Sequence, residues 1–167
     1  MKMFEAMTSE MQREAAITRR VLERVPADKL SWKPHPKSMS LGQLALHIAT
    51  LPGRLSRLAQ MDEFDIPAAN FDPPDPHSTE EILGAHDVSV KTAREYLSSI
   101  SEPAALGDWR LTFSGKEVFT ISRAELLRTM MLNHWYHHRG QISVYLRLLE
   151  VPVPAIYGRS ADENPFA

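Results

Sequence analysis

Seven histidines are spread along the chain, and two of them have the spacing of a metal-binding pair. His134 and His138 lie four residues apart, within a stretch from about 122 to 150 whose pattern predicts one helix. On an α-helix such residues project from the same side, one turn apart. Two imidazoles placed in this way can bind a divalent cation that prefers nitrogen ligands at about 2.0–2.1 Å. Apolar residues share their stripe, so we expect both rings to face the interior.

Two ligands hold a metal weakly, so a third has to come from another element. His47 lies within the apolar stripe of a second predicted helix and can face the pair from across the molecule, which would complete a three-histidine set. His86, on a third predicted helix, is the second candidate. The plainer alternative is that these rings are core histidines with satisfied hydrogen bonds, because buried polar groups usually find a partner within the protein.

Several nearby residues have types that can assist such a site, although no general base is evident. Gln141, one turn beyond the pair, can hydrogen-bond to the second nitrogen of a ligand or to a metal-bound water. Arg139 and Asn133 fall off the metal-facing stripe, where we expect a role in helix packing or at a dimer contact. Trp32 and Tyr157 either line the mouth of a cavity or simply pack against the protein.

The composition excludes several classes of function. The 167 residues suffice for a single domain, residues 1–167, with its own hydrophobic core. A formal net charge of −2, from 19 basic and 21 acidic residues, gives no support for binding nucleic acid. The absence of cysteine excludes disulfides, thiolate ligands and cysteine nucleophiles. No apolar run approaches the roughly 20 residues that span a bilayer, so we expect no membrane partner and a cytoplasmic location.

Hydrophobic periodicity predicts four helices and a fold that is otherwise all-α. The predicted ranges are about 2–24, 40–60, 78–100 and 122–150. A long proline-rich crossover, residues 61–77, separates helices 2 and 3. Residues 109–120 alternate about a glycine turn, which predicts a short β-hairpin that must lean on the helices before helix 4. Four helices with one long crossover predict a four-helix bundle, a fold that commonly builds metal sites from facing helices.

Three local features refine this picture. Pro52 and Gly53 lie inside the second predicted helix and predict a kink or a loosened turn there. We expect residues 101–121 to be non-helical. Residues 151–158 are rich in proline and predict an extended tail that packs back along the bundle.

Two motifs together resemble a known family. Residues 40–49 read Ser-Leu-Gly-Gln-Leu-Ala-Leu-His-Ile-Ala, and residues 134–141 read His-Trp-Tyr-His-His-Arg-Gly-Gln. This pairing resembles the DinB/YfiT-like family of bundle proteins. The segments Leu-Ser-Trp-Lys-Pro at 30–34 and Pro-Ala-Ile-Tyr-Gly at 154–158 also fit its pattern. The resemblance spans nearly the whole chain.

The resemblance implies a four-helix bundle in up-down-down-up order, a homodimer, and a divalent metal bound by three histidines. Carried over by motif, these ligands are His47, His134 and His138. His137, next to a ligand, points about 100° away on the helix and is expected at a surface or interface. Better characterised relatives are thiol-dependent and resemble bacillithiol transferases and mycothiol-dependent maleylpyruvate isomerases. The family name by itself implies no role in DNA repair.

These observations predict a divalent-metal-dependent enzyme of hydrolase or thiol-S-transferase type. Three imidazoles leave coordination positions open, which distinguishes catalytic from structural sites. A bound water would ionise near neutral pH, and a bound low-molecular-weight thiol would be held as thiolate, so either can attack a small electrophilic substrate. Zinc or nickel is favoured, and manganese, iron or cobalt also suits nitrogen ligands. The alternatives are a non-catalytic metal-binding bundle and a dimeric interaction bundle with core histidines.

Overall fold

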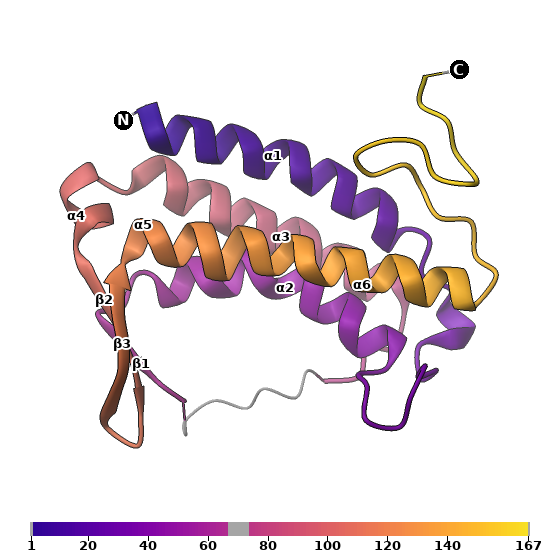
Figure 1. Ribbon diagram of the computed structural model, residues 1–167, viewed down its shortest axis with the longest axis horizontal. Helices are drawn as coiled ribbons and strands as arrows, with labels where there is room; N and C mark the ends of the chain where they lie inside the picture. Colours follow the sequence, from indigo (N-terminus) through magenta and orange to yellow (C-terminus); the bar gives the residue numbers. More distant parts are fainter. Residues whose placement is uncertain (1, 67–73, 167) are drawn as a thin grey trace.

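The structure is a computed structural model that describes residues 2–66 and 74–166, and it is mostly helical with a small sheet (Figure 1). The long helices are α1 (Lys2–Leu22), α2 (Leu41–Leu58), α3 (Thr79–Ser99) and α6 (His134–Leu148). The shorter helical elements are the 3-10 turn η1 (Ala27–Lys29), α4 (Glu102–Leu106), α5 (Arg123–Leu126) and the π-helical segment η3 (Leu127–Asn133). The strands are β1 (Glu63–Asp65), β2 (Asp108–Phe113) and β3 (Lys116–Ser122).

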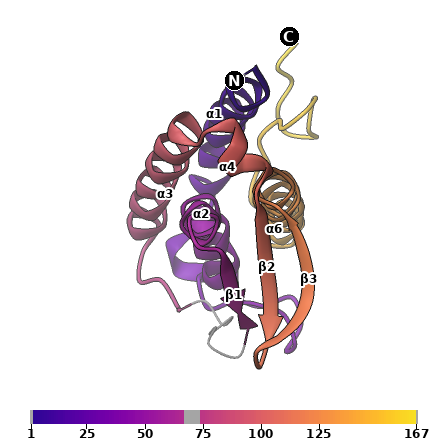
Figure 2. The same cartoon turned by 90° about the vertical axis from the view of Figure 1, so that its left-hand side faces the viewer.

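The long helices lie side by side, with α2 in contact with both α3 and α6, and α1 in contact with α3 (Figures 1 and 2). In Figure 1, α1 and α6 run from left to right, whereas α2 and α3 run in the opposite direction. The sheet stands at the end of the molecule where α2 ends and α5 begins. This arrangement places α2 directly beside α6, and these two helices carry the predicted metal-binding histidines.

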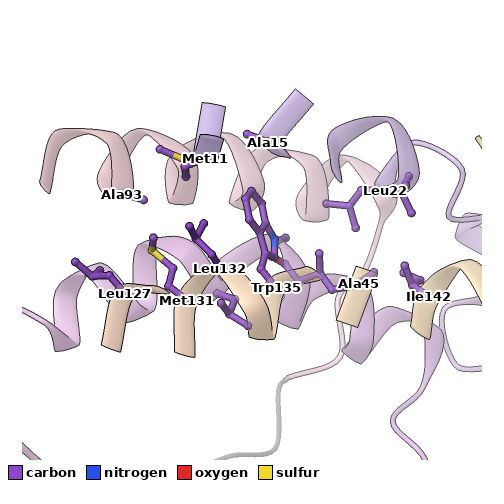
Figure 3. Close-up of a cluster of buried hydrophobic side chains, with 14 of the residues drawn as sticks. Met11, Ala15, Leu22, Ala45, Ala93, Leu127, Met131, Leu132, Trp135 and Ile142 are labelled. Atoms are coloured by element: carbon purple, nitrogen blue, oxygen red, sulfur yellow. The ribbon is translucent and has the colours of Figure 1, made fainter. Parts of the chain in front are cut away.

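The core forms where the apolar stripes of the helices meet (Figure 3). Trp135 of α6 is fully buried at its centre and packs with residues from the other long helices. Other labelled members of this cluster include Met11, Leu22, Ala45, Ala93, Leu132 and Ile142. Burial of these side chains supplies the main stabilisation of the fold and confirms the predicted inward faces.

Polar side chains define where α2 begins. The Ser40 hydroxyl accepts a hydrogen bond from the main-chain amide of Gln43 at 3.1 Å, and the Gln43 side chain accepts one from the Ser40 amide at 3.0 Å. This reciprocal pair satisfies two amide groups that a helix end leaves unpaired. Ser40 itself is buried, so the first turn of α2 is fixed within the protein and His47 is held at a defined place two turns later.

The sheet corrects the prediction of an otherwise all-α fold with one hairpin, because it has a third strand. The hairpin β2–β3 is present, and Ser114 and Gly115 form its turn with φ values of 50° and 73°. β1 pairs in parallel with β2, with Phe64 opposite Leu111. A three-residue strand shows no periodicity, so it could not be recognised within the proline-rich crossover. The described part of that crossover ends at Ile66 and resumes at Pro74.

One further prediction about local structure was wrong. The stretch from 101 to 121 was expected to be non-helical, yet it contains the short helix α4, capped by the Ser101 hydroxyl. The stretch from 122 to 150, predicted as one helix, is helical from Arg123 to Leu148, and within it α5, the π-helical η3 and α6 follow one another. A π-helical turn holds more residues than an α turn and is frequent at functional sites.

Alanine substitution at two glycines is expected to change the free energy of unfolding in opposite directions. A Cβ at Gly53 would lie 2.9 Å from Cα and 3.0 Å from the carbonyl oxygen of Ser89, where α2 crosses α3. We expect Gly53→Ala to lower the free energy of unfolding by about 1–3 kcal/mol, because main-chain atoms cannot move aside without separating the helices. Gly84→Ala meets nothing within 4 Å and is expected to raise it by about 0.5–1 kcal/mol. Urea denaturation measures both, and equal effects would contradict the close crossing.

Candidate metal centre

Three histidines from two helices meet at one point. The ring of His47, on α2, has its centroid 5.4 Å from that of His134 and 4.5 Å from that of His138, both on α6. The two α6 rings are 4.5 Å apart. Each ring offers one nitrogen, and these three nitrogens all lie within 4.8 Å of one another. Within residues 2–66 and 74–166, no other group of three histidines and carboxylates comes this close.

The hydrogen bonds of His138 indicate which of its nitrogens is free to bind a metal. Its Nδ1 lies 2.7 Å from the side-chain oxygen of Gln141, and its Nε2 lies 2.7 Å from Nε2 of His134. An amide oxygen only accepts, so this network assigns the proton of His138 to Nδ1 and a lone pair to Nε2. Gln141 thereby orients the ring, as partners of metal-binding histidines commonly do. Without a metal, Nε2 of His134 must donate to Nε2 of His138, and a cation would displace that proton.

One feature of His47 favours a bound cation over a core histidine whose hydrogen bonds are all made. Its Nε2 is buried and has no hydrogen-bond partner among the residues that the structure describes. A buried nitrogen left without a partner costs free energy, on the order of 1–3 kcal/mol. A cation shared with the other two rings would satisfy this nitrogen, so the donor set suits a metal that prefers imidazole ligands.

Burial keeps all three imidazoles neutral. It is the main cause that lowers the pKa of His47 to about 4, and the neighbouring His138, His134 and Arg54 lower this pKa further. Burial also lowers the pKa of His134 and that of His138, where the hydrogen bond to Gln141 acts in the opposite direction. Because the neutral ring is the form that binds metal, the site is ready for a cation at neutral pH.

The lowered pKa of His47 predicts that the metal-free protein is sensitive to acid. The ring binds a proton near pH 6.5 in the unfolded chain but only near pH 4 in the folded chain. Between these values the unfolded state binds more protons, so stability falls as the pH falls. We expect the free energy of unfolding to fall by about 2 kcal/mol over this pH range. This is less than the full shift in the pKa of His47 implies, because the ring is not completely buried. Urea denaturation at pH 7.5 and about pH 4 measures it, and an equal loss in His47→Asn would contradict this linkage.

A proline in α2 helps to hold α2 and α6 in register beside the histidines. Pro52 has no amide hydrogen, so the carbonyl of Ile48, four residues earlier, lacks its helical partner. The indole Nε1 of Trp135 donates to this carbonyl at 2.9 Å. Ile48 follows His47 and Trp135 follows His134 in sequence, so this bond joins the helices next to both rings. α2 continues through Pro52, so the loosening that the sequence predicted is used for a contact between helices.

Arg139 lies in a buried network on the other side of α6. Its side chain is 1% exposed and pairs with the carboxylate of Glu14, on α1, at 2.6 Å. It also donates to the hydroxyl of Thr18 at 3.0 Å and to that of Tyr157, in the C-terminal tail. Tyr157 in turn donates to Glu14 at 2.9 Å. Arg139 therefore has the packing role expected of it, and the tail packs back on the helices as predicted.

The remaining sequence candidates lie outside the three-histidine group. His137 is exposed, although its ring lies 4.9 Å from that of His138. His86, the second candidate for a third ligand, is buried and stacks on Trp135 at 6.2 Å. Trp32 packs edge-on against a tyrosine of α6 at 5.8 Å, so it anchors its loop.

A cavity opens beside the histidines, and neither its position nor its lining was predicted from the sequence. Its volume is about 240 Å³, and His47, His134, Arg54 and mainly apolar side chains line it. Arg54 follows His47 by seven residues, which places it on the same side of α2, two turns further on. This spacing is the one signal by which the arginine could have been found. The cavity gives the histidine cluster a chamber in which a small molecule can bind.

Comparison with known proteins shows the family of this chain. The model of the DinB family matches residues 1–164. The chain belongs to the DinB family. A relative, the protein YrdA of Bacillus subtilis (strain 168), is 25% identical over 150 residues, which cover 90% of this chain and 85% of YrdA. This membership confirms the resemblance noted from the sequence.

Solved DinB-like structures share the fold. A DinB-like protein from Bacillus cereus ATCC 10987 superposes with a TM-score of 0.68 at 25% identity, covering 89% of this chain and 94% of that protein. The DinB-like protein YjoA from Bacillus subtilis superposes with a TM-score of 0.69 at 19% identity, covering 92% and 98%. As for the membrane, none of the described helices of this DinB family member has the length and apolar character needed to cross one.

Proposed function

We propose that this DinB family protein binds a divalent metal ion through His47, His134 and His138 and acts as a hydrolase or a thiol-S-transferase. The observation that carries the proposal is the convergence of three neutral imidazoles beside a cavity that His47 and His134 line, with a buried nitrogen on each of these two rings that has no hydrogen-bond partner among the described residues. Zinc or nickel suits this donor set best, and manganese, iron or cobalt also fits.

The residues around the cluster would divide the work of such an enzyme. The metal, when bound, supplies a Lewis acid with positions open to water, thiol or substrate. Gln141 holds the proton of His138 on Nδ1 and keeps that ring aimed at the cluster. The apolar walls of the cavity exclude water and strengthen electrostatic interactions within it.

The proposal extends to the surroundings of the site. We infer one domain in which α1, α2, α3 and α6 form an up-down-down-up four-helix bundle, supported by the helix directions in Figure 1. The substrate is a small molecule, and the family supports a low-molecular-weight thiol as the second reactant. A cytoplasmic homodimer without nucleic-acid or membrane partners is the form that we expect to act.

The decisive experiment measures metal and activity on the same preparation. Protein purified without a histidine tag should carry about one equivalent of metal per chain, as purified or after reloading. Ester hydrolysis and thiol transfer to an electrophile are then assayed before and after chelation. Less than about half an equivalent after reloading would contradict the metal site and leave the interaction bundle. Full loading without metal-dependent activity would leave a non-catalytic metal-binding bundle.

A further inference from the structure

The cavity beside the three histidines is apolar along most of its wall. One side is α2, the opposite side is formed by the start of the last helical stretch, and the sheet closes the far end. Trp109 and Phe119 of the sheet lie in contact with each other, with ring centroids 6.4 Å apart, and both face this space. A wall of this kind favours an apolar and preferably flat molecular body.

One cation stands within this wall. Arg54 is half-buried on α2, and no hydrogen bond or ion pair joins it to any other residue that the structure describes. Its positive charge acts on His47, at the histidine end of the cavity, and contributes to the lowered pKa of that ring. By contrast, Arg123 at the base of the sheet meets Asp62 at 2.6 Å and three main-chain carbonyls. Within residues 2–66 and 74–166, Arg54 is therefore left available to a ligand.

A half-buried guanidinium in an apolar cavity selects for an anion. Arginine binds carboxylates through paired, charge-assisted hydrogen bonds. One guanidinium compensates one negative charge, and a second buried charge would lose its hydration without a partner. A volume of about 240 Å³ corresponds to roughly eight water volumes of about 30 Å³, which suits an acid of about ten to twelve non-hydrogen atoms.

We propose that the substrate is a small monocarboxylate with an apolar, preferably aromatic body, and that its carboxylate pairs with Arg54. Seven residues of helix separate Arg54 from His47, which is about 10 Å along the axis. The reacting group at the histidines is thus separated from the carboxylate by several bonds. This inference rests on the proposed function for the reacting end only, since the carboxylate site is built by the cavity itself.

The test uses hydrocinnamate and its neutral isostere, hydrocinnamamide, as probes in isothermal titration calorimetry. Metal-stripped protein is used first, so that the acid cannot bind a metal directly, and zinc-loaded protein second. We expect the wild type to bind the acid at least about 10-fold more tightly than the amide, and Arg54→Gln to remove this preference. Arg54→Lys should keep part of it, because the charge remains without the paired geometry. Arg57→Gln, an exposed arginine outside the cavity on the same helix, should behave as wild type.

Each outcome decides one of the two proposals. Equal affinity for acid and amide, absence of binding of both, or a preference that survives in Arg54→Gln would overturn the carboxylate site. Metal analysis of the same preparations reports separately on the histidine cluster. A preference that depends on Arg54 in a protein that cannot be loaded with metal would overturn the proposed function and leave the carboxylate site standing.

Discussion

His138→Ala is expected to lower the affinity for zinc by at least about 100-fold, because loss of an outer-shell partner alone typically costs about 10–100-fold. The substitution removes Nε2 of His138, one of the three converging nitrogens, which lies 2.7 Å from Nε2 of His134. Two nitrogens from different helices would remain, and these hold a cation weakly. Competition with a chelating dye measures the affinity, and metal analysis after dialysis measures the retained metal.

A graded series separates ligation from general effects on α6. His137→Ala changes the neighbouring residue, which is exposed and outside the cluster, and should leave the affinity unchanged. Gln141→Ala removes only the acceptor that orients His138 and should cost about 10-fold or somewhat more. Equal losses in His137→Ala and His138→Ala would show that the metal does not bind at the cluster.

Arg139→Met is expected to cause the largest loss of stability of any single substitution considered for this protein. It leaves the carboxylate of Glu14, 13% exposed, without the guanidinium that pairs with it at 2.6 Å. Removing one partner of a buried ion pair typically costs about 3–5 kcal/mol, and we expect about 3 because Glu14 retains some exposure and its bond to Tyr157. Thermal unfolding of the metal-free protein should show a fall in Tm of roughly 6–12 °C.

Two variants test whether burial of the Arg139–Glu14 ion pair is the reason for this loss of stability. Arg147→Met removes an exposed arginine of the same helix that pairs with Asp162, and it should cost at most about 1 kcal/mol. The double variant Arg139→Met with Glu14→Met removes both charges and should recover much of the loss, because no unpaired buried charge remains. If Arg139→Met lowered the free energy of unfolding no more than Arg147→Met, the network joining α6 to α1 would contribute little to stability.

The elements that were predicted well depend on contacts between near neighbours in the sequence. The apolar stripes of α1, α2, α3 and α6 follow the helical period, and the buried side chains confirm them. The hairpin follows from alternation about Gly115. The pairing of His134 with His138, and the hydrogen bond from His138 to Gln141, follow from spacings of four and three residues on one helix.

The elements that were missed depend on partners far away in the sequence. β1 is a strand only because β2 lies alongside it, and three residues are too few to show a period. Arg54 appears as one more charge on α2 until the sheet closes the cavity in front of it. The π-helical segment before α6 likewise has no composition that distinguishes it from an α-helix.

The sequence by itself determined where the four long helical segments form, which faces they bury, and that two histidines of the last helix stand one turn apart, because these are properties of a single periodic segment. The family motif pointed to His47, but only the tertiary structure shows that its ring, and not that of His86, lies beside that pair. The choice depends on how α2 and α6 pack, including the bond from Trp135 to the carbonyl that Pro52 leaves free. Contacts between distant segments arise from packing in three dimensions, which no local pattern encodes.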